Sequence, residues 1–130
     1  MPVKGNSGVA LRSPFQGNPA YVGMEIQLLH DEGHKGLQPT QYTGSIYGVV
    51  PPKSHVSKPP GEWNRMRIVA RGRNVVIELN GTEIVNANLD DYKEFAKEHP
   101  GLSRKKGRLG LQSYKGSRAK FRNLFVKPLP

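Results

Sequence analysis

"NVVIELNGTEIVN", residues 74–86, contains the clearest structural signal in the sequence. Two runs of mostly apolar residues flank Asn80-Gly81, a pair that tolerates the positive φ angles of a tight turn. Just upstream, apolar residues alternate with arginines in residues 64–72, which is the two-residue period of a strand. We therefore predict a strand within residues 64–72, followed by a β-hairpin over 74–86.

The rest of the chain repeats this pattern of short runs between turns. Fifteen glycines and eleven prolines separate the runs, which is typical of an all-β sandwich or barrel. The prolines of residues 51–62 predict a long extended loop. Further candidate strands cover residues 7–13, 21–30, 44–50, 107–113 and 119–129.

We predict a single helix, near residues 90–98. Asp90 or Asp91 can cap its N-terminus, and Pro100-Gly101 ends it.

The bulk composition suits one domain that covers residues 1–130. No apolar run approaches the roughly 18 residues of a membrane span, and the N-terminal "MPVKGNSG" has no apolar signal-peptide core. Cysteine is absent, which excludes disulfides, thiolate chemistry and cysteine-ligated zinc.

The net charge of +10 is concentrated near the C-terminus. Nine of the twenty Lys and Arg residues lie in residues 101–130, which contain no Asp or Glu. The other eleven lie in residues 1–100, together with all ten Asp and Glu residues. Such a basic segment suggests a polyanion, either nucleic acid or an acidic polysaccharide. No aromatic residues interleave regularly with the bases, so a solvated basic face is the simpler interpretation and nucleic acid is not the expected partner.

The stretch "GMEIQLLHDEGH", residues 23–34, contains the best candidates for a site. Glu25 and Gln27 alternate with apolar residues, so both point to the strand face opposite the apolar one. That face is either an ordinary solvent face or a concave sheet that lines a ligand groove. In a groove, Arg12 of the neighbouring candidate strand could pair with Glu25 or hold a ligand hydroxyl.

Two further features have a functional and an ordinary interpretation. His30, Asp31, Glu32 and His34 could converge on a metal ion in a turn, or they form a solvated loop. Trp63 could stack on a sugar ring, or it belongs to the core. Neither a serine-histidine-acid triad nor a phosphate-binding glycine motif can be placed.

With these residues laid out, the chain resembles a known family, the 3-keto-disaccharide hydrolase domain family. The resemblance extends from Asn6 to Leu129 and rests on seven pieces in the family's order: "GNSGVALRSP", "GMEIQLL", "YTGSIYGVVPP", "KPPGEWNRMRI", "LNGTEIVNANL", "GRLGLQ" and "FRNLFVKPL". It implies a two-sheet antiparallel β-sandwich, a concanavalin A-like jelly roll, with a concave sugar-binding face.

The resemblance also implies an activity on glycosides or disaccharides whose sugar is oxidised at carbon 3. Such a reaction needs a general base near C2 and a group that polarises the ketone. Glu25 matches the family's strand glutamate, a candidate base or metal-binding carboxylate, and Arg12 matches the arginine after "NSG" that would hold an oxygen of the sugar. Gln27, Tyr47 and Gln112 would orient the sugar, and a divalent cation could polarise the ketone.

Two positions depart from the family pattern. His30, followed by Asp31, stands where relatives usually have an aspartate, and these two residues are the metal-ligand candidates. Tyr114 stands where relatives usually have a histidine. A tyrosine can hydrogen-bond to substrate but is a poor metal ligand and a poor base near neutral pH.

The family domain also normally begins well before the position of Asn6. We therefore expect a jelly roll that lacks the family's N-terminal strands: either an excised fragment of a longer protein, or a shortened version whose exposed sheet edge a homodimer could cover. The resemblance favours a periplasmic or secreted location, although the chain shows no signal peptide.

The sequence leaves three functions open. The first is a hydrolase or lyase acting on a 3-keto-glycoside, and the alternative is a non-catalytic, lectin-like carbohydrate-binding module. The third is a polyanion binder that uses the basic residues 104–122.

Overall fold

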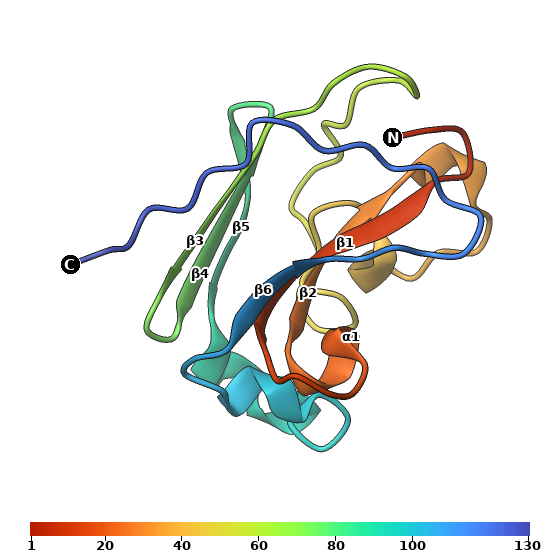
Figure 1. The fold of residues 1–130 in the computed structure, drawn as a ribbon. Helices are drawn as coiled ribbons and strands as arrows, with labels where there is room; N and C mark the ends of the chain where they lie inside the picture. Colours follow the sequence, from red (N-terminus) through yellow and green to blue (C-terminus); the bar gives the residue numbers. More distant parts are fainter.

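Two three-stranded antiparallel sheets face each other in the structure, a computed structural model that describes residues 1–130 (Figure 1). One sheet has the strand order β2-β1-β6, and the other has the order β3-β4-β5. The predicted two-sheet antiparallel sandwich is confirmed. The strands are β1 (Asn6–Ser13), β2 (Met24–Leu29), β3 (Met66–Arg71), β4 (Asn74–Leu79), β5 (Thr82–Asn88) and β6 (Arg108–Leu111).

The predicted hairpin is formed by β4 and β5, and β3 pairs with the other edge of β4. Asn80 and Gly81 have φ angles of 52° and 84°, the left-handed conformation that the tight turn requires. The Asn80 side chain also donates to the carbonyl of Val56 at 2.8 Å. This bond ties the turn to the long loop that precedes β3.

The core lies between the two sheets. Met24 and Ile26 of β2 and Val75 and Ile77 of β4 are at most 1% exposed. Each such side chain contributes roughly 1.5–3 kcal/mol by leaving water. These inward-facing residues fix the register, because a slip by one residue would turn each of them outward.

The sandwich is closed on one side and open on the other. On the side of β2 and β5, Ile46 pairs with Ile26, and the Lys53 N–H donates to the carbonyl of Ile84 at 2.7 Å. Residues 44–53 therefore connect the two sheets. On the opposite side, β3 and β6 are the outer strands of their sheets, and no strand pairs with their free edges.

The helical segments are all short, and none has the length and apolar character that a membrane crossing requires. The predicted helix near residues 90–98 is shorter than expected: it is a 3-10 helix with a kink at Tyr92, capped by the Asn88 side chain, which accepts from the N–H of Asp90. The helical segments are α1 (Pro19–Val22), η1 (Asp31–Gly33), η2 (Pro39–Gln41), η3 (Leu89–Phe95) and η4 (Pro100–Ser103).

Two predicted strands are not regular strands. Residues 44–50 form only isolated bridges, because Gly44 and Gly48 adopt φ angles of 87° and 74° that turn the chain. Residues 119–129 are extended but lie outside both sheets, and no backbone hydrogen bond holds them. Figure 1 shows this C-terminal segment crossing the front of the molecule beyond β6.

Candidate functional site

Polar side chains gather on the face of the β2-β1-β6 sheet that points away from the core. Met24 and Ile26 of β2 belong to the core, so the alternation of the strand places Glu25 and Gln27 on the opposite face. Gly8 of β1 lies opposite Gln27. We call this surface the outer face of the sheet.

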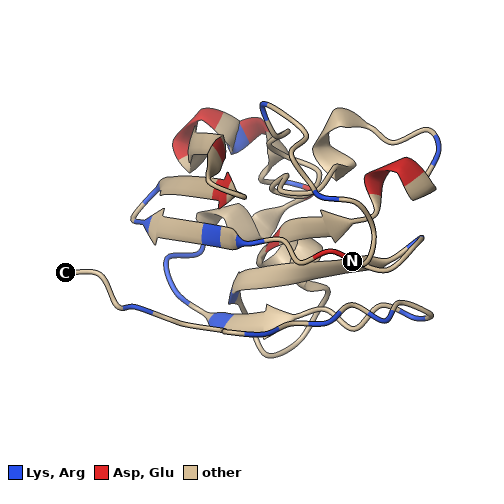
Figure 2. Cartoon of the chain, turned by 90° about the horizontal axis from the view of Figure 1, so that it is seen from above, with Lys and Arg blue, Asp and Glu red and all other residues tan.

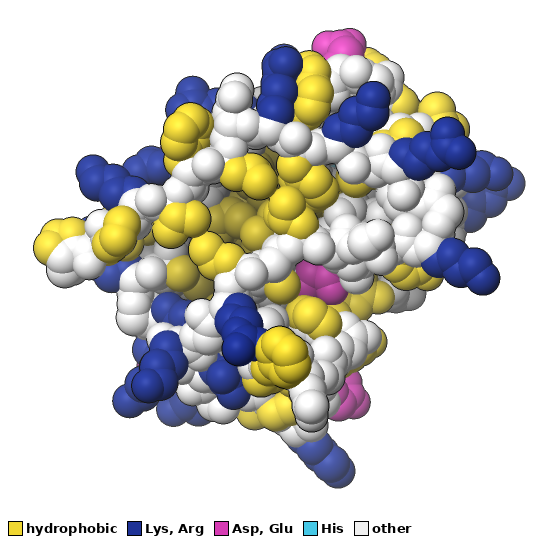
Figure 3. Space-filling view, in the orientation of Figure 1, with side chains coloured by type: hydrophobic (Ala, Val, Ile, Leu, Met, Phe, Trp, Pro, Cys, Tyr) yellow, Lys and Arg dark blue, Asp and Glu magenta, His cyan; other side chains and the backbone are white.

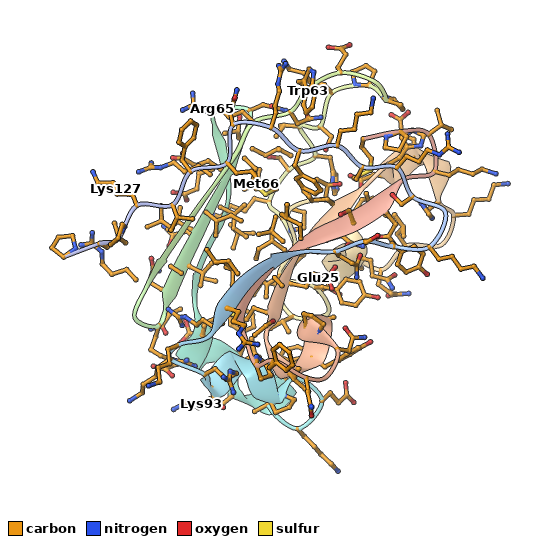
Figure 4. All side chains as sticks on the ribbon, in the orientation of Figure 1. Glu25, Trp63, Arg65, Met66, Lys93 and Lys127 are labelled. Atoms are coloured by element: carbon orange, nitrogen blue, oxygen red, sulfur yellow. The ribbon has the colours of Figure 1, made fainter.

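Gly8 gives the Glu25 side chain room to lie across β1. A Cβ atom at position 8 would collide with Oε1, Cγ and Cδ of Glu25. The carboxylate therefore rests on the β1 backbone, and a glycine in a strand often marks such a close approach. Figure 4 shows Glu25 beside β1 and β6.

Burial changes the ionisation of Glu25. The residue is 5% exposed, and desolvation raises the pKa of its carboxyl group from 4.5 to about 7. No hydrogen bond or ion pair from the protein lowers the pKa again. Glu25 is therefore close to half ionised at neutral pH, which suits a group that accepts and returns a proton.

Gln112 and Gln27 bring amide groups to the same face. The Gln112 backbone N–H donates to the carbonyl of Gly8 at 2.9 Å, which places Gln112 directly beside the glycine under Glu25. The side-chain Oε1 of Gln112 is buried and has no partner in the protein. Gln27 is 5% exposed, so its amide is held in a confined position.

Tyr47 and Ser45 border Glu25 and Gln27 on the far side of β2. The Tyr47 N–H donates to the carbonyl of Glu25 at 2.8 Å, and the Gln27 N–H donates to the carbonyl of Ser45 at 3.0 Å. The buried Ser45 Oγ has no partner in the protein. An unpaired buried hydroxyl costs free energy, which a ligand hydroxyl could offset.

The structure does not bring Arg12 to Glu25. A register shift interrupts β1 between Ala10 and Ser13, and Arg12 adopts a φ of 51° there. The side chain instead donates from Nη2 to the carbonyl of Gly72 at 2.7 Å, in the turn between β3 and β4. Arg12 thus connects the two sheets, because the bulge turns it away from the outer face.

The predicted metal ligands do not form a metal site. Nδ1 of His30 accepts from the Lys4 N–H at 3.0 Å, and Oδ1 of Asp31 accepts from the N–H and hydroxyl of Thr43 at 3.0 and 2.9 Å. No group of three or more His, Cys, Asp or Glu side chains could hold a metal ion. Because this donor set does not fit a divalent cation, we derive no chemical step from one.

Trp63 lies apart from Glu25, and Tyr114 is an exposed residue shortly after Gln112. Trp63 is in the loop before β3, well separated from Glu25 (Figure 4), and the Arg122 guanidinium covers its ring at 4.0 Å from the centroid. Tyr114 is 51% exposed, in the loop that follows Gln112. Of the predicted residues, the structure brings together Glu25, Gln27, Tyr47 and Gln112.

The residues that sequence reasoning missed are Gly8 and Ser45. The glycine in "NSGV" interrupts an apolar strand pattern, which is a usual signal for a close approach. Ser45 is two residues before Tyr47, at the spacing that places both on one face of an extended chain.

Comparison with solved structures identifies similar folds. A protein of Parabacteroides distasonis ATCC 8503, provisionally described as a glycosyl hydrolase, matches with a TM-score of 0.80 and 28% identity over 88% of this chain. A second protein of the same organism, described in the same way, matches with a TM-score of 0.69 and 26% identity over 86% of this chain. The chain spans 66% of the first of these proteins and 60% of the second.

A comparison with curated proteins gave no match. The family comparison is decisive, because one family model matches residues 1–127, nearly the whole chain. Both solved structures are consistent with it, and the resemblance found in the sequence is confirmed. The chain belongs to the 3-keto-alpha-glucoside-1,2-lyase-like domain family, which is glycosyl hydrolase-like.

Proposed function

We propose that this protein cleaves glycosides whose sugar carries a ketone at carbon 3, with Glu25 as the general base. One observation carries the proposal: Glu25 has a pKa of about 7, and backbone pairing places Gln27, Tyr47 and Gln112 on or beside the same strands. A carboxylate of this basicity can remove a proton from carbon at neutral pH when a neighbouring carbonyl acidifies it. Membership of the family supports the choice of a 3-keto sugar.

The reaction begins at C2 of the sugar, next to the ketone. Glu25 takes the C2 proton, and the electron pair of the C–H bond forms an enolate that extends onto the C3 oxygen. The enolate then forms the C1=C2 double bond as the C1–O bond breaks and the C3 ketone is restored. The leaving oxygen becomes an alcohol by taking the proton that Glu25 removed, which returns Glu25 to its ionised form. Water adds its hydroxyl to C1 and a proton to C2, so the net reaction is hydrolysis without an oxidant or a reductant.

The neighbouring side chains of this chain bind and orient the sugar. The amide of Gln27, which lies on the same face as Glu25, would donate to the C3 oxygen as charge develops there. The side-chain Oε1 of Gln112 would accept from a sugar hydroxyl, because it has no partner in the protein. The exposed Tyr114 would contact the part of the substrate that extends from the sheet.

The test uses a 4-nitrophenyl 3-keto-glucoside and follows release of nitrophenol. The wild type is expected to release it, and Glu25→Gln is expected to lose activity by roughly 100-fold or more, because the amide cannot accept the proton. Glu78→Gln is the matched control, since Glu78 lies in the other sheet and pairs with Arg67 at 3.5 Å. Activity that survives in folded Glu25→Gln, or no turnover by the folded wild type, contradicts the proposal.

Carbohydrate binding without cleavage is the second candidate function. It is favoured by the unpaired side-chain Oε1 of Gln112 and by the exposed Tyr114, which could bind a sugar even if Glu25 performed no chemistry. Calorimetry with the 3-keto-glucoside and the unoxidised glucoside separates the two functions. Binding that persists in Glu25→Gln, together with no turnover by the wild type, would identify a binding module.

A further inference from the structure

A large cleft lies between the two sheets, on the face of β1, β2 and β6 opposite to Glu25. Its volume is about 1950 Å³, and it opens between β3 and β6. Figure 3 shows hydrophobic side chains gathered in a hollow on this side of the molecule. Leu109 and Leu111 of β6 line the cleft and are 55% and 44% exposed, although they belong to the inner face of their sheet.

Both strands at the opening have free backbone edges. β3 pairs only with β4, and β6 pairs only with β1. A free strand edge presents a row of unpaired N–H and C=O groups, which can pair with another extended chain. The cleft therefore combines an apolar floor with two unpaired edges, which together fit a β-strand.

The side chains of β3 define the chemistry of such a strand. Its inward-facing residues, including Met66 and Ile68, line the cleft, so a neighbouring strand would direct apolar residues inward. On the outward face, Arg67 and Arg71 are exposed, and Arg67 also pairs with Glu78 of β4 at 3.5 Å. Opposite charges stabilise neighbouring positions across a strand pair, so the outward residues of the added strand should be acidic.

We propose that this cleft is the docking site for an extended strand of a partner polypeptide, in which apolar residues alternate with Asp or Glu. The strand pairs with the free edge of β3 and covers Leu109 and Leu111 from β6. The proposal concerns a surface separate from Glu25 and does not depend on the proposed glycoside chemistry.

The protein's own C-terminal segment does not fulfil this role. Residues 119–130 lie along the cleft without a backbone hydrogen bond, and they contain Lys120, Arg122 and Lys127 but no acid. Figure 2 shows Lys and Arg recurring along this segment. Like charges opposite Arg67 and Arg71 disfavour pairing with β3.

A second copy of the protein is disfavoured for the same reason. Antiparallel pairing of two β3 strands centred on Val69 would place the arginines of one copy opposite those of the other. The charge pattern of the edge therefore selects an acidic partner over self-association.

The test uses two blocked nine-residue peptides, one alternating Val with Glu and the other alternating Val with Lys. Binding is measured by the fluorescence of Trp63, which lines the cleft, and the pairing site is mapped by hydrogen exchange. The Val-Glu peptide is expected to bind at least tenfold more tightly than the Val-Lys peptide. It should also slow exchange of the β3 amides.

Charge-reversal variants complete the test. Arg67→Glu combined with Arg71→Glu should reverse the preference, so that the Val-Lys peptide binds more tightly. Lys93→Glu combined with Lys97→Glu is the matched control, because both lysines are exposed on the segment after β5 and outside the cleft, and it should leave the preference unchanged. Circular dichroism verifies that each variant is folded.

Three outcomes would overturn the proposal. The first is that neither peptide binds to the folded protein. The second is that both peptides bind equally well, which would indicate an apolar contact without strand pairing to β3. The third is that sedimentation shows a dimer whose β3 amides are already protected, which would assign the cleft to a second copy.

Discussion

At the scale of single residues, the pair formed by Glu25 and Gly8 determines what the outer face can do. Gly8 has no Cβ, so the carboxylate can lie on the β1 backbone where little water reaches it. The resulting pKa of about 7 gives the group its basicity. The same burial destabilises the fold whenever the carboxylate is charged.

Glu25→Gln should stabilise the protein at alkaline pH while it removes activity. The carboxyl pKa is about 7 in the folded protein and 4.5 without burial. The unfolded chain therefore releases this proton first, and the stability of the wild type falls as the pH rises from 4.5 to about 7. At pH 8 the variant should unfold with a free energy roughly 1–3 kcal/mol higher than the wild type, because solvent screening reduces the full value of the shift.

Urea denaturation at pH 4 and at pH 8 measures this difference. The two proteins should have similar stability at pH 4, where Glu25 is protonated in both the folded and the unfolded wild type. A variant that is less stable than the wild type at pH 8 would contradict the assigned pKa.

Gly8→Ala should reduce activity by displacing the carboxylate. The added Cβ collides with Glu25, so the side chain must move away from β1. A displacement of about 1 Å can cost 100-fold in rate, and the overpacking should cost about 1–3 kcal/mol. Kinetics and urea denaturation measure the two effects.

The control for this prediction is the same substitution in a Glu25→Ala background. There the collision is absent, so Gly8→Ala should cost little stability. An equal cost in both backgrounds would show that Gly8 acts through the backbone and not through Glu25.

At the scale of elements, the sequence predicts a strand correctly where the local apolar and turn pattern is matched by a neighbouring strand that can pair with it. Residues 74–86 combine apolar strands with a turn pair, so β4 and β5 form as predicted. Residues 119–129 also look like a strand, but their bases would lie beside the arginines of β3 and they remain unpaired. Residues 44–50 contain apolar residues that reach the core, yet Gly44 and Gly48 bend the chain into turns.

The bulge in β1 explains why the role of Arg12 could not be predicted. Strand alternation would place Arg12 on the outer face, but the shift before Ser13 sends its side chain to the turn at Gly72. Arg12→Met should therefore lower the free energy of unfolding by about 1–3 kcal/mol, because the variant loses the hydrogen bond from Arg12 to Gly72 that joins the two sheets.

Activity should be nearly unchanged in folded Arg12→Met, since the guanidinium does not reach Glu25. Urea denaturation and the nitrophenol assay, performed on the same preparation, check both parts. A loss of turnover without a loss of stability would show that Arg12 contacts the substrate.

At the scale of the whole molecule, the sandwich has two distinct surfaces that the sequence could not separate. Alternation alone predicted that Glu25 and Gln27 share a face, and the resemblance added Gln112. The structure pairs Gln112, just after β6, with Gly8 of β1. Trp63 looks like a sugar-stacking residue in the sequence, but it belongs to the rim of the cleft between the sheets. Only the tertiary arrangement assigns each residue to one side of the β2-β1-β6 sheet.

The role of Glu25 as the base is tested most directly by proton exchange at C2 of a 3-keto-glucoside in D₂O, followed by NMR across a range of pH. In the proposed reaction ionised Glu25 is the base, so the exchange rate should rise with pH to a plateau, with a midpoint at about 7. Glu25→Gln should abolish the enzyme-dependent exchange at every pH. Exchange that persists in the folded variant, or a wild-type rate that does not rise through this range, would contradict this role.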